Sequence, residues 1–91
     1  MLSDDFKKAV KDFDAFLAVR TDDMNVYLNR GLVLLNLKKY DEAIADFNRG
    51  MQLAPRFPNL YRARAVAYKL KGDNAQAQAD ELYAAQLESG Q

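Results

Sequence analysis

The apolar residues of this chain recur every three or four positions, which is the spacing that predicts amphipathic helices. The strict alternation of apolar and polar residues that predicts strands does not occur, so we expect an all-α fold. Polar turns divide the pattern into five segments. We predict helices over residues 4–20, 24–37, 41–53, 58–71 and 74–89.

The ends of the predicted helices carry residues suited to starting and stopping a helix. Asp22 or Asp23, and later Asp73, can accept hydrogen bonds from the free N–H groups of a first turn. Pro58 suits the first helical position, because its φ is already helical and its missing N–H would be unpaired there. Gly72 can adopt the left-handed conformation that ends many helices.

The whole pattern repeats along the chain with a regular period. Sliding the sequence by one period places Phe13 on Phe47, and the same shift places Tyr27 on Tyr61. The period is about 34 residues, a length typical of stacked helical hairpins, in which each hairpin buries its apolar face against its neighbours.

One stretch resembles the tetratricopeptide repeat. The resemblance is carried by an aromatic residue, a glycine, a large residue, an Ala-x-x-x-Phe pair and a closing proline. These are Tyr27, Gly31, Leu34, Ala43, Phe47 and Pro55. Residues 24–57 and 58–91 each resemble a whole repeat, the second with a polar C-terminal cap, and residues 3–23 resemble the second helix of a preceding repeat. The resemblance implies one domain over residues 1–91, a tetratricopeptide-like solenoid of five antiparallel helices.

Small and charged residues that recur in phase have packing roles in this interpretation. Four small residues are expected to let the two helices of one hairpin approach to about 8–10 Å. They are Gly31, Ala43, Gly50 and Ala77. Two arginines are each expected to bond a carboxylate of the partner helix, because residues repeated in phase usually serve the repeat itself. The pairs are Arg30 with Asp46 and Arg64 with Asp80.

Composition argues against several classes of function. The 91 residues include 13 basic and 13 acidic side chains, and this zero net charge argues against binding of nucleic acid or of an anionic membrane. Without histidine, cysteine or a glycine-rich phosphate loop, no nucleophile and base can be recognised. We therefore expect no enzyme, no catalytic residue, no metal site and no cofactor. No targeting or membrane-spanning segment is visible, and we expect a cytoplasmic protein.

The resemblance implies that the first helices of successive repeats line a concave groove that binds a short peptide or a partner helix. Helical spacing assigns twelve residues of segments 24–37 and 58–71 to this groove. They are Asn25, Leu28, Asn29, Leu32, Leu35, Asn36, Asn59, Arg62, Ala63, Val66, Lys69 and Leu70. Asparagine amides can bond a peptide backbone as donor and acceptor, and the leucines and Val66 supply apolar contact.

Residues 55–71 contain five cations and no acid, which favours an acidic ligand segment or a C-terminal carboxylate at this end of the groove. The cations are Arg56, Arg62, Arg64, Lys69 and Lys71. The alternative is that four acids of the following stretch pair with the neighbouring helix. These acids are Asp73, Asp80, Glu81 and Glu88.

The first predicted helix carries more aromatic surface than one adjoining helix can cover. Its exposed candidates are Phe6, Phe13 and Phe16. Each phenylalanine left in water forgoes about 1.5–3 kcal/mol of burial. These residues suggest self-association, most simply as a homodimer about a twofold axis, so a homo-oligomerisation module is the alternative function. A fragment of a longer array, or a helix that tilts to hide its own aromatics, would explain the same residues.

Overall fold

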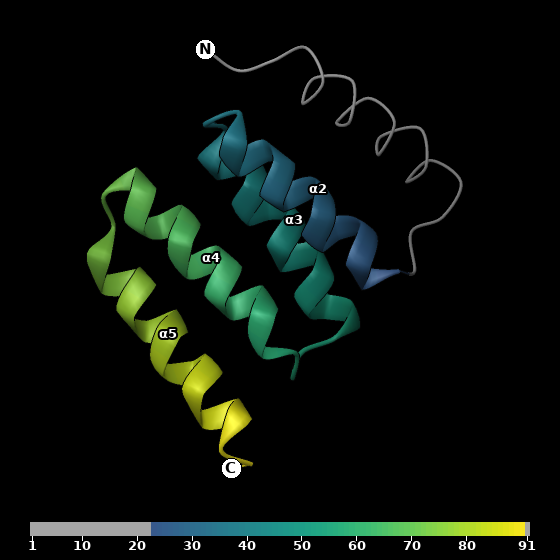
Figure 1. Cartoon of the computed structure of the whole chain (residues 1–91), viewed down its shortest axis with the longest axis vertical. Coiled ribbons are helices and arrows are strands. Elements are labelled where there is room, and N and C mark those ends of the chain that lie inside the picture. The colour runs from purple at the N-terminus through teal and green to yellow at the C-terminus, as the bar shows by residue number, and fades with distance from the viewer. Residues whose placement is uncertain (1–22, 91) are drawn as a thin grey trace.

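The computed structural model describes residues 23–90, which form four helices (Figure 1). The helices are α2 (Met24–Asn36), α3 (Tyr40–Leu53), α4 (Pro58–Lys71) and α5 (Asn74–Glu88). These bounds agree with the predicted segments to within one residue at each end. The predicted helix over residues 4–20, with Phe6, Phe13 and Phe16, lies outside the described residues, so the five-helix solenoid stays a prediction.

The caps of α2 and α5 confirm the predicted start residues. The Asp23 carboxylate accepts a hydrogen bond from the Asn25 backbone N–H at 2.9 Å. The Asp73 carboxylate accepts one from the Gln76 backbone N–H at 3.2 Å. These bonds satisfy donors that the first turn of a helix leaves free.

The two turns inside the hairpins use the same backbone conformation with different residues. Gly72, which ends α4, has φ 99°. Lys38 stands one period earlier in the sequence and also has positive φ, at 62°. A side chain disfavours this left-handed region, so the lysine costs conformational energy that the glycine does not.

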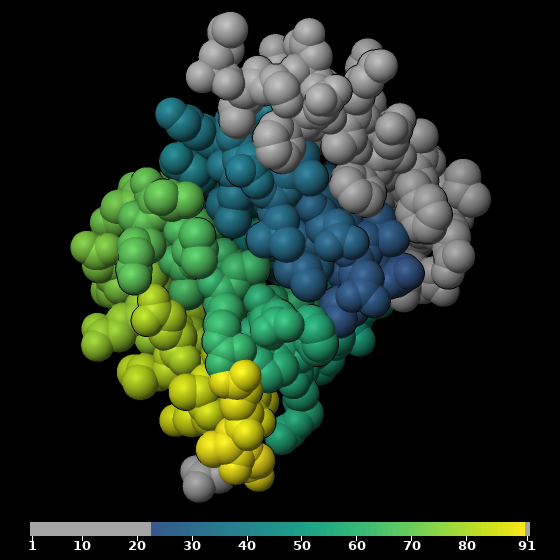
Figure 2. All heavy atoms as spheres, viewed as in Figure 1, coloured from purple at the N-terminus to yellow at the C-terminus, as the bar shows by residue number. Residues whose placement is uncertain are grey.

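The helices lie side by side as two hairpins, α2 with α3 and α4 with α5 (Figure 1). Helix α4 packs against α3 on one side and α5 on the other, and it also contacts α2. Side chains fill the spaces between the ribbons on the face shown in Figure 2. The main core lies where the first hairpin meets α4. Its buried members are Leu34, Ala43, Ile44, Phe47, Leu60, Ala63 and Ala67.

Two glycines allow close packing, but not at the same interface. A Cβ on Gly31 would collide with the ring of Phe47, so this glycine lets α2 approach α3 as predicted. A Cβ on Gly50 would lie 2.8 Å from Cδ2 of Leu60. Because Leu60 belongs to α4, the tight approach at Gly50 is between hairpins, while the backbone oxygen of Met24 in its own hairpin would lie at an ordinary contact distance of 3.7 Å.

Candidate interaction surfaces

Each hairpin is joined by the predicted pair of arginine and aspartate. Arg30 donates to both oxygens of Asp46 at 2.7 and 2.8 Å, and Arg64 donates to both oxygens of Asp80 at 2.8 and 2.7 Å. The hydrogen bond to Asp80 raises the pKa of Arg64. Both aspartates are buried, so the paired arginines supply the partners that a buried carboxylate requires. The structural interpretation of these pairs is confirmed.

The predicted groove residues on α2 and α4 are exposed to different degrees. Eight are exposed, and the seven uncharged ones among them form what we call the α2–α4 face. They are Asn25, Asn29, Leu32, Asn36, Asn59, Val66 and Leu70. The exposed fractions of Leu32, Val66 and Leu70 are 41%, 50% and 54%. Such large apolar side chains in water are candidates for contact with a ligand.

The remaining apolar residues assigned to the groove belong to the core. Leu28 and Leu35 are partly buried against the core cluster, and Ala63 is a buried member of it. The reason is that α4 rests on this part of α2, which the spacing of one helix by itself does not reveal. These three residues therefore support the α2–α4 face and offer little surface to a ligand.

Two asparagines of this face already have partners inside their own helices. The Asn36 amide donates to the Leu32 carbonyl at 3.0 Å, and the Asn59 oxygen accepts from Arg62 at 3.3 Å. A ligand backbone that bonded these amides would have to replace those interactions. Asn25 and Asn29 are exposed at the other positions of α2.

Four of the five cations in residues 55–71 are paired with carboxylates of the chain itself. Arg62 pairs with Glu88, Lys69 with Glu81 at 3.4 Å, and Arg64 with Asp80. The fourth, Lys71, reaches Asp41 of the first hairpin at 2.6 Å. The alternative interpretation of the charges is confirmed for Asp80, Glu81 and Glu88, while Asp73 is a helix cap. The positive field expected at this end of the face is largely neutralised.

A pocket of about 440 Å³ lies between α4 and α5. It is lined by Arg62, Val66, Glu81 and Ala85. Helical spacing places Arg62 and Val66 in the groove, but it does not show that α5 lines the same site. The repeat period could have done so, because the equivalents of Glu81 and Ala85 in the first hairpin, Phe47 and Met51, are core or core-packed residues.

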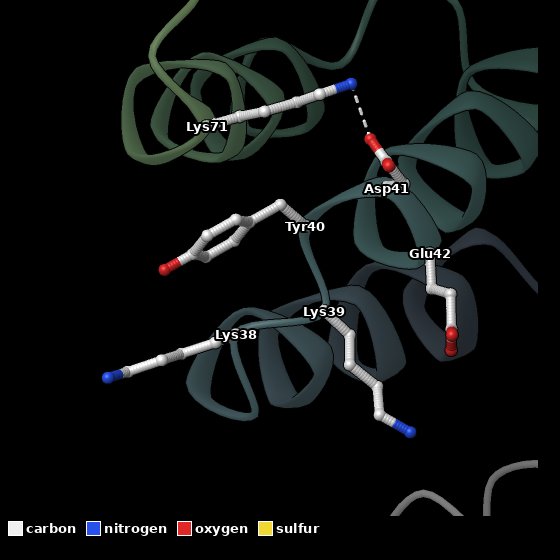
Figure 3. Close-up of a pocket in the computed structure, with 6 residues that line it drawn as sticks. All are labelled: Lys38, Lys39, Tyr40, Asp41, Glu42 and Lys71. Carbon is white, nitrogen blue, oxygen red and sulfur yellow. Dashed lines mark ion pairs between the residues drawn. The ribbon is translucent and has the colours of Figure 1, made fainter.

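A second pocket, of about 270 Å³, lies where the turn between α2 and α3 meets the end of α4 (Figure 3). Its lining residues are Lys38, Lys39, Tyr40, Asp41, Glu42 and Lys71. The ion pair drawn in Figure 3 joins Lys71 to Asp41, and this contact raises the pKa of Lys71. Asp41 and Glu42 also suit the positive end of the α3 dipole. The Lys71–Asp41 ion pair links the two hairpins at an exposed site.

Among residues 23–90, no cluster of three or more carboxylates is placed to hold a metal ion. None of the four helices there is long and apolar enough to cross a bilayer.

The chain is similar in sequence to known tetratricopeptide repeat proteins. The family model of the tetratricopeptide repeat matches residues 25–57. The chain is 31% identical over 73 residues to Tetratricopeptide repeat protein 28 of Homo sapiens, a match that covers 80% of this chain and 3% of that protein. It is 40% identical over 55 residues to the Peroxisomal targeting signal receptor of Eremothecium gossypii, covering 60% of this chain and 10% of the receptor. The chain thus spans a tenth or less of these two relatives.

A solved structure shares the fold. MamA (AMB-1) superposes with a TM-score of 0.92 at 27% sequence identity. The match covers 97% of this chain and 52% of the MamA chain.

Proposed function

Because this chain is a tetratricopeptide repeat protein, we propose that it is a noncatalytic protein-interaction module that binds a short peptide or a partner helix on the α2–α4 face. One observation carries the proposal. Leu32, Val66 and Leu70 are 41–54% exposed on helices that pack together, and asparagines stand beside them on the same two helices. Apolar side chains of a ligand would lose contact with water here, while the amides could bond its backbone.

The relatives support an interaction role in general terms. The Peroxisomal targeting signal receptor is by its name a protein that recognises a signal, and it is similar to this chain over 55 residues. We extend recognition of a peptide to this chain on the strength of the exposed face described above.

Apolar and amide contacts, more than charge, would hold the ligand. The sequence favours an acidic segment or a terminal carboxylate, but Arg62 and Lys69 already have Glu88 and Glu81 as partners. A carboxylate of a short ligand that left these groups in water would have to replace one of these partners. The gain would be small because ion pairs that stay exposed contribute only about 0–1 kcal/mol. Self-association through Phe6, Phe13 and Phe16 stays a prediction, since these residues lie outside the described ones.

Selection of peptides against the whole chain tests the proposal. A displayed library of short random peptides is selected on the wild type, and the dissociation constants of the chosen peptides are measured by fluorescence anisotropy. Leu32→Glu combined with Leu70→Glu places two carboxylates on the α2–α4 face. We expect at least tenfold weaker binding, which corresponds to about 1.4 kcal/mol.

The matched control combines Leu53→Glu with Leu82→Glu. It makes the same chemical change at leucines that are 44% and 60% exposed on α3 and α5, outside the face. We expect this variant to bind as the wild type does, with an unchanged circular dichroism spectrum in both variants. Equal binding by both variants, or a failure to select any peptide, would contradict the proposal.

A further inference from the structure

The first hairpin shows how this fold seats an additional helix. Helix α4 rests on it through Leu60, Ala63 and Ala67, which pack in one cluster with residues of both α2 and α3. The seat contains two leucines of α2, two apolar residues of α3 and the alanine that caps the C-terminus of α3. They are Leu28, Leu35, Phe47, Met51 and Ala54.

In the second hairpin four of the five equivalent positions carry charged residues in place of apolar ones. Moving each residue of the first seat forward by one period gives Arg62, Lys69, Glu81, Ala85 and Glu88. We call this set, together with Val66, the α4–α5 face. The pocket of about 440 Å³ lies within it, where Val66 and Ala85 replace the larger Leu32 and Met51. The smaller side chains leave space that a large apolar side chain could fill.

Charge on this face is sorted by helix. Arg62 and Lys69 lie on α4, and Glu81 and Glu88 lie on α5 with the same spacing. The spacing is close to two helical turns, so each pair forms a row about 10 Å long. Arg62 bonds Glu88 and Lys69 bonds Glu81 across the pocket, so a basic row faces an acidic row.

The basic residues of α4 and the acidic residues of α5 determine which kind of helix the α4–α5 face can bind. A helix that presented only apolar residues, as α4 does to the first hairpin through Leu60, Ala63 and Ala67, would cover four charged groups. The loss of hydration costs several kcal/mol per ion unless further bonds replace the water. A helix with carboxylates on the edge above α4 and cations on the edge above α5 would supply those bonds. Complementary charge of this kind raises specificity and association rate.

We propose that the α4–α5 face docks an amphipathic helix of a partner protein, with a large apolar side chain in the pocket and charges of opposite sign on its two edges. The partner's carboxylates lie over Arg62 and Lys69, and its lysines or arginines lie over Glu81 and Glu88. This site shares Val66 with the α2–α4 face, but it differs in its use of α5 and in its dependence on charge.

Three synthetic helical peptides, each long enough to cover both charged rows, test the proposal against the full chain. All carry one apolar stripe. The first has carboxylates along one edge and lysines along the other, the second has the same composition with both signs mixed on each edge, and the third has glutamine on both edges. At about 50 mM salt we expect the first to bind at least tenfold more tightly than the others, and we expect the difference to shrink at about 500 mM as screening increases.

A rearranged protein gives the sharper test. Lys69→Glu combined with Glu81→Lys keeps the composition, the net charge and an ion pair across the pocket, but it mixes the signs on both helices. We expect at least a tenfold loss of binding by the first peptide and no loss by the glutamine peptide. The variant with Leu32→Glu and Leu70→Glu should bind the first peptide normally, which separates this site from the α2–α4 face.

Several outcomes would overturn the proposal. They are equal binding of the three peptides, no effect of the rearrangement on a folded protein, and no measurable binding of the first peptide at low salt. Docking of the glutamine peptide alone would also overturn it, by showing that an apolar helix, and not a charged one, occupies the face.

Discussion

The two hairpins of this chain share a backbone plan and differ in which surface is covered. At one position of the period the first hairpin has Phe47, which is fully buried, and the second has Glu81, whose side chain is 52% exposed. The residue opposite Phe47 is Gly31, and its counterpart in the second hairpin is Ala65, which carries the methyl group that Gly31 lacks. The comparison shows that the contact between Phe47 and Gly31, which lies inside the first hairpin, is not kept in the second, where an exposed glutamate and a buried alanine take these positions.

The buried aspartates, in contrast, keep a contact inside each hairpin. Asp46 accepts hydrogen bonds from Arg30 and also from Arg49 at 2.5 Å. At the place of Arg49 the second hairpin has Tyr83, which packs edge-on against Tyr61 with the ring centres 4.7 Å apart. The bond between arginine and aspartate within each hairpin is retained, while the second arginine at Asp46 is replaced by a tyrosine in the second hairpin.

The largest effect is expected at the position of Phe47. Phe47→Ala removes a ring from the core and should lower the free energy of unfolding by about 3–5 kcal/mol. The matched change Glu81→Ala should alter it by less than about 0.5 kcal/mol, because the side chain is exposed. Chemical denaturation followed by circular dichroism measures both, and similar losses would refute the division between the hairpins.

Gly31 and Ala65 provide a second, smaller contrast. Gly31→Ala drives a methyl group into the Phe47 ring and should cost about 1–3 kcal/mol, despite the better helix propensity of alanine. Ala65→Gly should cost about 1 kcal/mol through propensity. Repeating Gly31→Ala in a Phe47→Leu background should reduce its cost, and an unchanged cost would show that the ring is not the obstacle.

The smallest effect concerns the pKa of Tyr61, which burial raises above its ordinary value, with a further contribution from Tyr83. Because the folded-state pKa exceeds the unfolded value of about 10, this phenol stabilises the fold fully below about pH 10. The contribution disappears as the pH rises through the folded-state pKa. Nuclear magnetic resonance titration should find one tyrosine with a raised pKa that is absent from Tyr61→Phe. A Tyr61 pKa at or below its ordinary value would contradict this expectation.

Most of the described fold could be predicted from the sequence, because its signals are local. Asp23, Pro58, Gly72 and Asp73 mark helix ends through their own backbone and side-chain chemistry. Lys38 is the exception: its left-handed φ is imposed by the hairpin, and nothing in a lysine indicates it.

The candidate surfaces were harder to predict, because they depend on where α4 and α5 come to rest. Helical spacing assigned Leu28 to the groove, but the position of α4 makes it part of the core. For Arg62 the sequence left two interpretations open, a ligand carboxylate or an acid of the following stretch, and the partner found is Glu88 at the far end of the next helix.

One guanidinium is shared by three helices. Arg64 of α4 binds Asp80 of α5, and it also donates to the Asn48 side chain of α3 at 2.8 Å. Unfolding of either hairpin therefore removes the hydrogen bond between Arg64 and Asn48 from the other, and it also exposes the core between them. We therefore expect α3, α4 and α5 to unfold together in one cooperative transition. The free energy of unfolding of this stretch is then not a sum of independent values for the two hairpins.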